Sequence, residues 1–150
     1  MARILVWFRG KDLRTSDHAP LRDAVAKGEV VPVFVLDPYF FAPSRARELP
    51  HRMQYLLESL EALSQNIAHL GSELLVVPGK SVELIPKMVE ALRITQVVAH
   101  RWTEPFARER DRRIGAALNV PFDLYEGETL RPPVQLRTGS GTPYAVYTPF

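Results

Sequence analysis

The chain of 150 residues contains no cysteine. Its absence excludes disulfides, thiolate zinc sites, iron–sulfur clusters and cysteine nucleophiles. Long apolar runs are also missing, because none approaches the roughly 18 residues that a membrane-spanning helix requires. The apolar part of the N-terminus is too short for a signal peptide and is typical of a first strand instead. We therefore expect a cytoplasmic protein with no membrane contact.

Common catalytic and phosphate-binding signatures are absent as well. The sequence has no GxGxxG, no GxxxxGK followed by Ser or Thr, and no GxSxG. No nucleophile–base pair is visible, so we expect no catalysis by these residues alone. The histidines lack metal-ligand spacing and an acid arranged beside them, so we expect each to be structural or exposed. They are His18, His51, His69 and His100.

Charges of both signs are present in nearly equal amounts. There are 19 Lys and Arg against 17 Asp and Glu, giving a net charge of +2 and a pI near 9.1. Most of the cations are arginine, which favours bidentate pairing with carboxylate or phosphate. This balance permits an anionic partner but does not indicate nucleic-acid binding. The 46% hydrophobic content suffices for one domain with its own core.

Short apolar runs alternate with helical patterns along the chain. The runs are rich in β-branched residues, as expected of strands that are covered on both faces. We predict strands over residues 4–8, 30–36, 74–77, 96–100 and 122–125. We predict helices from residue 19, over 53–70, from Ser81, which would be a helix cap, and from Pro105 to 118. This order predicts an α/β fold: an open, doubly wound, Rossmann-like sheet of about five parallel strands with helices on both faces.

The character of the sequence changes after residue 128. The last segment is rich in proline and contains the turn sequence TGSGTP, which predicts a hairpin followed by a linker. We therefore divide the chain into an α/β domain over 1–128 and a hairpin and linker over 129–150. The final residues are aromatic and apolar, so we expect the linker to lead into a further domain.

Two charged segments allow more than one interpretation. The loop after the first strand carries Asp12 and Asp17, which form either an ion-pair and helix-cap cluster, with Asp17 as the N-cap, or the wall of a ligand site. The charge run near residues 108–113 predicts a solvated helix face with a Glu109–Arg113 pair. The alternative for that run is one arginine turned inward beside the end of the fourth strand.

An ordered series of short motifs extends along almost the whole chain. The motifs are Trp7-Phe8-Arg9, Asp12-Leu13-Arg14, Ser16-Asp17, Leu36-Asp37-Pro38, Gly71-Ser72, Glu104-Pro105-Phe106-Ala107-Arg108, Gly139-Ser140-Gly141 and Val146-Tyr147-Thr148-Pro149-Phe150. In this order and spacing they resemble the opening of DNA photolyases and cryptochromes. The resemblance implies the N-terminal α/β domain of that family, which holds a light-harvesting antenna chromophore. It also implies a following helical domain that binds FAD and damaged DNA and repairs pyrimidine dimers with light.

By the same resemblance, the antenna lies in a cleft formed by the loops that leave the strands. Aromatic and aliphatic side chains would enclose a planar ring there, and a few polar groups would fix its orientation. The cofactor-binding residues that the resemblance implies are Arg9, Lys11, Asp12, Phe34, Leu36, Asp37, Arg101, Trp102, Glu104 and Arg108.

Three departures from the family pattern bear on the chromophore. Gly10 and Lys11 separate Arg9 from Asp12, where the family has one residue. The folate-type members have an Asn-Glu pair where this chain has Phe106-Ala107, and the deazaflavin-type members have an acid at the position of Trp102. The resemblance therefore implies a deazaflavin or flavin antenna rather than methenyltetrahydrofolate, with an empty cleft as the alternative.

The expected function is thus that of an antenna domain whose partner is the FAD-binding domain of the same parent protein. Damaged DNA would be bound through that other domain and not through this one. Two alternatives from other classes are a stand-alone nucleotide-binding α/β module and a docking domain with an empty cleft.

Overall fold

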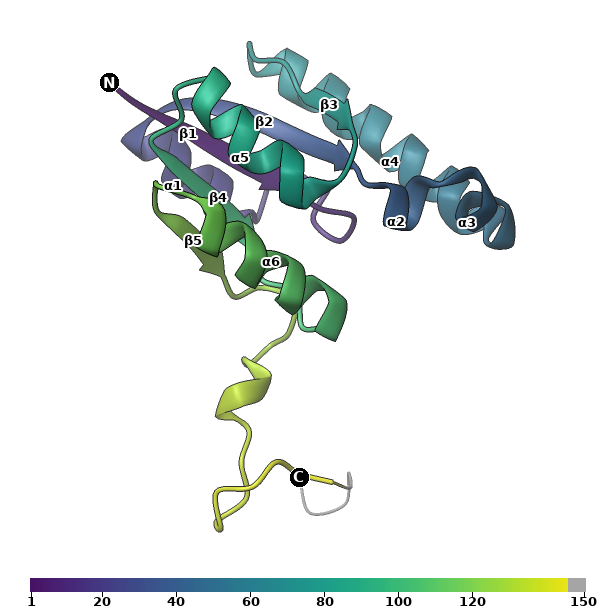
Figure 1. Ribbon diagram of the computed structural model, residues 1–150, viewed down its shortest axis with the longest axis vertical. Helices are drawn as coiled ribbons and strands as arrows, with labels where there is room; N and C mark the ends of the chain where they lie inside the picture. The colour runs from purple at the N-terminus through teal and green to yellow at the C-terminus, as the bar shows by residue number, and fades with distance from the viewer. Residues whose placement is uncertain (146–150) are drawn as a thin grey trace.

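The computed structural model describes residues 1–145, and its centre is one sheet of five parallel strands (Figure 1). The strand order is β3-β2-β1-β4-β5. The strands are β1 (Ala2–Phe8), β2 (Gly28–Leu36), β3 (Leu75–Pro78), β4 (Gln96–His100) and β5 (Phe122–Tyr125). The predicted doubly wound α/β fold is confirmed.

Helices connect the strands and cover both faces of the sheet (Figure 1). The helices are α1 (Ala19–Lys27), α2 (Pro38–Phe41), α3 (Pro43–Glu48), α4 (Pro50–His69), α5 (Ser81–Ala91) and α6 (Pro105–Ala117), followed by the 3-10 turn η1 (Pro133–Gln135). In Figure 1, α5 and α6 lie in front of the sheet. The segment between β2 and β3 contains more helices than expected, because the two short helices α2 and α3 precede α4.

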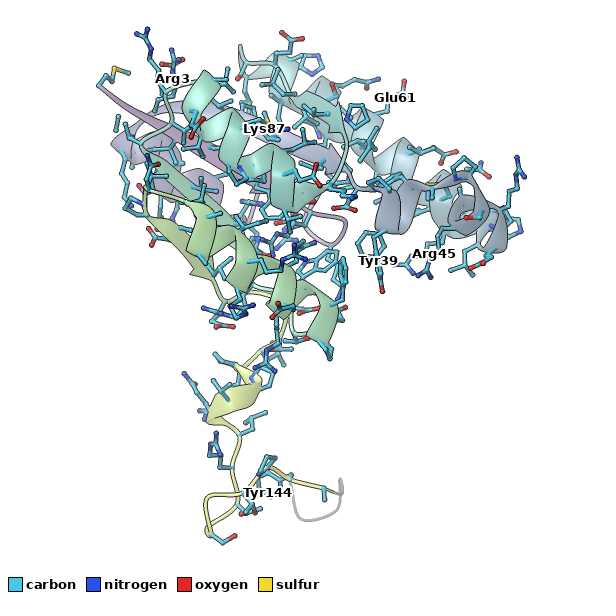
Figure 2. All side chains as sticks on the ribbon, in the orientation of Figure 1. Arg3, Tyr39, Arg45, Glu61, Lys87 and Tyr144 are labelled. Carbon is cyan, nitrogen blue, oxygen red and sulfur yellow. The ribbon has the colours of Figure 1, made fainter. Side chains whose placement is uncertain are left out.

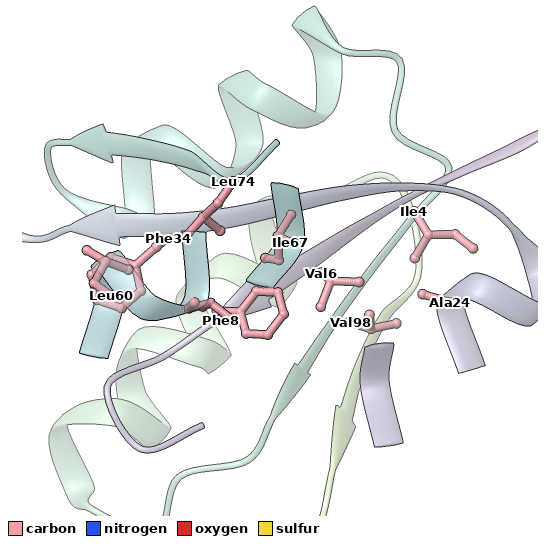
Figure 3. Close-up of a cluster of buried hydrophobic side chains, with 10 residues drawn as sticks. Ile4, Val6, Phe8, Ala24, Phe34, Leu60, Ile67, Leu74 and Val98 are labelled. Carbon is pink, nitrogen blue, oxygen red and sulfur yellow. The ribbon is translucent and has the colours of Figure 1, made fainter. Parts of the chain in front are cut away.

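Two apolar cores lie on the two faces, because successive side chains of a strand point to opposite sides. In β1, Ile4, Val6 and Phe8 join the core under α1 and α4. Figure 3 shows these side chains beside residues from α1, α4 and the neighbouring strands. Leu5 and Trp7 point the other way and join the core under α5 and α6. This two-sided burial is why the strands are continuously apolar rather than alternating.

The strand order reverses between β1 and β4. From β1 the chain continues to β2 and β3 on one side, and then returns to add β4 and β5 on the other. The loops that leave β1 and β4 therefore diverge at the carboxyl edge of the sheet and leave a crevice between them. Ligands of open α/β sheets bind in such a crevice.

Two predicted helix caps are corrected. His18, not Asp17, is the N-cap of α1, since its side chain accepts a hydrogen bond from the Leu21 N–H while the Asp17 side chain points into solvent. Asp17 instead has φ +49° and allows the loop to turn. Ser81 is the first residue of α5 and not its cap, and its hydroxyl donates to Asp37.

The segment after β5 extends away from the sheet (Figure 1). An antiparallel bridge between Arg137 and Pro143 closes the turn that the sequence predicts there. The boundary at 128/129 stays a prediction, and residues 146–150 of the expected linker lie outside the described residues. Among residues 1–145, no helix is long and apolar enough to cross a membrane.

Replacing Gly79 with alanine is expected to lower the free energy of unfolding by about 1–3 kcal/mol. Gly79 follows β3 with φ +140°, and a Cβ there would lie 2.9 Å from Leu84 Cδ1. Urea denaturation measures the change. Gly139→Ala is the matched control, because a Cβ at Gly139 would meet nothing within 4 Å. Equal midpoints for the two variants would contradict the expectation.

Candidate functional site

A cavity of about 610 Å³ lies at the carboxyl edge of the sheet, where the strand order reverses. Its lining comes from the ends of β1 and β2 and the loop after β1, from α2–α4 and the start of α5, and from the segment after β4 together with α6. Thus both halves of the sheet contribute. The lining residues nearest the sheet are Trp7, Phe8, Arg9, Phe34, Val35, Trp102, Ala107 and Arg110, whereas those nearer the rim include Tyr39, Arg45, Glu48, Arg52 and Tyr55.

Aromatic rings close one side of this cavity. Tyr39 of α2 stacks on Phe106 of α6, with ring centroids 3.7 Å apart and an interplanar angle of 9°. Phe40 packs edge-on against both Phe106 and Trp102. Figure 2 shows Tyr39 with Arg45 beside it, and the Arg45 guanidinium lies 5.0 Å from the Tyr39 ring centroid. The lining therefore offers flat surfaces to a planar ligand.

A buried ion cluster forms the inner wall. The Arg9 guanidinium donates to both carboxylate oxygens of Asp111, at 2.8 and 3.0 Å, and Arg110 Nε donates to the same carboxylate at 3.1 Å. Burial lowers the pKa of Arg9 to about 10, and the nearby Arg110 charge acts in the same direction, whereas Asp111 opposes both. Arg110 is thus the arginine that turns inward from the charge run.

Three aromatic rings surround the Arg110 guanidinium. Its central carbon lies 4.8 Å from the Trp7 ring centroid, 5.5 Å from that of Trp102 and 5.9 Å from that of Phe106. The Arg9 guanidinium lies over the Trp7 ring as well, with its central carbon 4.2 Å from the ring centroid. Such cation–π contacts hold both arginines in fixed positions.

Asp37 joins the ends of two strands. Its carboxylate accepts hydrogen bonds from the Tyr39 N–H at 3.0 Å and from the Ser81 N–H and Oγ at 2.8 and 2.6 Å. Burial alone would raise the pKa of Asp37, but these hydrogen bonds and the Arg110 charge hold it below its usual range. Asp37 is therefore ionised and fixes α2 to the start of α5.

The extra residue in the first loop spans the crevice. The Lys11 ammonium pairs with Glu104 and Glu128, and it lies 4.9 Å from the Trp102 ring centroid. Burial acts to lower the pKa of Lys11, and the hydrogen bonds to the two carboxylates outweigh it, so the net shift is upward. Gly10 lines the cavity, and a Cβ there would lie 3.5 Å from the Leu56 side chain.

A second buried cluster lies outside the cavity and corrects the expectation that no acid accompanies the histidines. Asp12 Oδ2 contacts His18 Nε2 at 3.1 Å and His100 Nδ1 at 2.7 Å, while Asp12 Oδ1 accepts from the Arg9 N–H at 2.6 Å. His18 Nδ1 accepts from the Leu21 N–H, so Nε2 carries the ring proton and donates the hydrogen bond to Asp12. With both ring nitrogens used in this way, His18 has no lone pair for a metal, and the cluster is a hydrogen-bonded support.

Six of the ten residues that the resemblance implies line the cavity, and four do not. Among the four, Asp12 centres the histidine cluster and Leu36 packs against the core under α1 and α4. Arg101 pairs with Glu126 at 2.8 Å, and Arg108 is exposed. The six that line the cavity are Arg9, Lys11, Phe34, Asp37, Trp102 and Glu104.

The cavity also contains residues that sequence reasoning did not select. Arg110 and the Tyr39–Phe106 stack belong to this group. The charge run left open that one arginine turns inward, and the burial of Arg110 and Asp111 in the structure shows which one it is. The exposed pair on that helix joins Glu109 to Arg112 rather than to the predicted Arg113.

Comparison with known proteins identifies a family over nearly the whole chain. The family model described as DNA photolyase matches residues 4–150. A deoxyribodipyrimidine photo-lyase of Thermus thermophilus is 37% identical over 150 residues, covering 100% of this chain and 33% of the relative. A cryptochrome DASH of Gloeobacter violaceus is 40% identical over 140 residues, covering 89% of this chain and 28% of the relative. The chain thus spans about a third of the length of the first curated relatives that it matches.

Solved structures agree with this assignment. A bacterial class III photolyase from Agrobacterium tumefaciens superposes with a TM-score of 0.83 and 30% identity, covering 99% of this chain and 30% of that one. An archaeal photolyase from Sulfolobus tokodaii, solved with two FAD molecules, has a TM-score of 0.74 and 23% identity, covering 91% of this chain and 32% of that one. The latter likeness supports the fold alone.

Proposed function

The chain belongs to the DNA photolyase family, and on that premise we propose that its cavity holds a planar light-harvesting chromophore. The observation that carries the proposal is the aromatic-lined cavity of about 610 Å³ at the point where the strand order reverses. This volume lies within the range of roughly 300–1,000 Å³ that is typical of small-molecule sites. The domain would absorb a photon and transfer the excitation, without bond-making chemistry of its own.

The lining favours a flavin or deazaflavin over methenyltetrahydrofolate. Trp7 and Phe34 from the strand ends, with Trp102 and the Tyr39–Phe106 stack, offer apolar faces to a tricyclic ring. Phe106 and Ala107 lie where the folate-type pattern has polar residues, so neither of them offers a side-chain acceptor to a pterin. Arg9, Lys11, Asp37 and Glu104 supply the charged groups, and Lys11 and Glu104 already pair with each other at the cavity wall.

The activity of the parent protein follows from the family and not from this cavity. The curated relatives named deoxyribodipyrimidine photo-lyases are about three times as long as the chain. We propose that a helical FAD-binding domain of the same parent protein receives the excitation and uses it to reverse pyrimidine dimers in DNA. Damaged DNA would contact that domain, since the nearly balanced charges of the present one, 19 Lys and Arg against 17 Asp and Glu, do not indicate a DNA interface.

The chain is expected to bind riboflavin or a 5-deazaflavin saturably, with a near-UV or blue absorption band that co-elutes with the protein and is released on denaturation. Quenching of ligand fluorescence measures the affinity. Gly10→Leu should weaken binding at least about tenfold, because the new side chain projects toward Leu56 and Trp102 in the cavity. Gly139→Leu is the matched control, since Gly139 is exposed in the distant turn.

Three results would argue against this proposal. Tighter binding of methenyltetrahydrofolate than of either flavin would overturn the chromophore class. Equal affinity in the Gly10→Leu variant and the control would place the ligand outside the cavity. Failure of every ring to bind would overturn the antenna role, and saturable adenine-nucleotide binding in its place would support a nucleotide-binding module.

A further inference from the structure

The cavity changes character between its inner end and its mouth. Buried aromatic side chains such as Trp7 and Phe34 line the inner end. The mouth is formed by three exposed, charged residues of α3 and the first turn of α4, namely Arg45, Glu48 and Arg52. A ligand that matches this arrangement has a planar apolar end and a charged end.

The charged groups farther inside the cavity already have partners within the protein. Both arginines of the inner wall donate to the Asp111 carboxylate, and further acids act on them electrostatically. Lys11 pairs with two glutamates, and the Asp37 carboxylate accepts three hydrogen bonds. Among residues 1–145, the inner end of the cavity therefore offers no unpaired cation to an anionic group of a ligand.

The two arginines at the mouth are different. In the part of the chain that the structure describes, neither the Arg45 nor the Arg52 guanidinium forms an ion pair or a hydrogen bond. Arg45 lies over the Tyr39 ring, 5.0 Å from its centroid, and this contact holds it beside the cavity (Figure 2). Glu48 is the single acid within residues 38–57, which contain three arginines. The mouth thus carries a net positive charge.

Two arginines at one opening favour a phosphate group. A guanidinium presents paired N–H donors that match two phosphate oxygens. A phosphate monoester carries a charge of about −1.5 to −2 at neutral pH, so it can interact with both arginines at once. Because the mouth is exposed, the gain in affinity should be moderate and should depend on ionic strength.

We infer that Arg45 and Arg52 form a phosphate subsite at the mouth of the cavity, so that the chromophore is a phosphorylated flavin. The inference rests on the proposed function and adds the chemical class of its ligand. The ring would occupy the aromatic inner end, and the sugar-alcohol chain would extend to the mouth and place the phosphate between the two arginines.

Riboflavin and flavin mononucleotide test this inference as a matched pair, because they differ only in the terminal phosphate. Quenching of flavin fluorescence gives the dissociation constant of each for the chain. At low ionic strength, flavin mononucleotide is expected to bind about tenfold more tightly than riboflavin. In about 0.5 M sodium chloride this advantage should fall to about twofold or less, because salt screens exposed charges.

Variants at the mouth should change the ratio of the two affinities. Arg45→Gln and Arg52→Gln should each reduce the ratio about threefold, and the double variant should abolish the advantage of the phosphate. Glu48→Gln should raise the ratio about twofold, because it removes a charge that repels phosphate. Arg47→Gln is the matched control, since Arg47 is exposed on α3 but does not line the cavity. Both affinities are measured on one protein, so a partly unfolded variant does not alter their ratio.

The outcomes distinguish the inference from the proposed function. Equal affinities of the wild type for the two flavins would overturn the inference and leave the antenna role standing. The same holds if the double variant keeps the wild-type ratio, or if Arg47→Gln lowers the ratio as much as the double variant does. If no flavin or deazaflavin binds at all, both the inference and the proposed function fail.

Discussion

The Asp111→Ala variant is expected to lose about 3–5 kcal/mol of unfolding free energy. The substitution removes the carboxylate that receives two hydrogen bonds from Arg9 and one from Arg110. Both guanidinium groups would then lie in the interior without the carboxylate to which they donate hydrogen bonds. Burial lowers the pKa of Arg9 to about 10 even with Asp111 in place, and the loss of Asp111 would remove the interaction that opposes this shift.

Urea denaturation at neutral pH measures this loss. Glu109→Ala is the matched control on the same helix, because the Glu109–Arg112 pair is exposed and such pairs contribute little. The control should unfold at the wild-type midpoint. A similar midpoint for Asp111→Ala would mean that water or another acid reaches the two arginines, and would contradict the expected loss.

The second large effect is expected at Asp12. Asp12→Ala removes the acceptor of the Arg9 N–H and of both buried histidines, and should cost about 3 kcal/mol or more because three buried donors lose their partner. It should also release the loop that precedes α1, since His18 is the N-cap of that helix. Asp17→Asn is the control, because the Asp17 side chain is 99% exposed.

The contribution of Asp12 should depend on pH. Burial acts to raise the pKa of Asp12, but hydrogen bonds from His100, His18 and the Arg9 N–H lower it from 3.8 to about 2. The unfolded chain therefore takes up this proton first as the pH falls, and the native state loses about 2 kcal/mol between roughly pH 4 and pH 2. Denaturation midpoints across this range should converge for the wild type and Asp12→Ala. A constant difference would contradict the lowered pKa.

The fold could be predicted from the sequence because its signals are local. Apolar runs such as 96–100 and 122–125 coincide with β4 and β5, and Pro105 begins α6 as its position predicts. The strand order could not be read in this way, since it depends on which runs pair across the sheet. The start of α1 at residue 19 was predicted correctly, but its N-cap was assigned one residue too early, because an aspartate is a common cap and a histidine is not.

The candidate site was predictable only in part, for a related reason. Arg9, Asp37 and Trp102 were selected through the family resemblance, and they lie next to strand ends, where ligands of parallel sheets bind. The contact between Asp12 and His100 could not be predicted, because it requires β1 and β4 to be neighbours although 88 residues separate the two side chains. Arg110 was hidden in a charge run whose helical face could be assigned only after α6 packed on the sheet.

The reversal of strand order places the two walls of the cavity on different halves of the molecule. One wall follows β2 and the other follows β4, and aromatic contacts bridge them: Tyr39 stacks on Phe106, and Phe40 packs edge-on against Phe106 and Trp102. A molecule that fills this space would contact both walls at once and bind only the folded chain, so ligand binding and folding would be linked equilibria. The amount of folded protein in a cell would then rise and fall with the supply of the proposed chromophore.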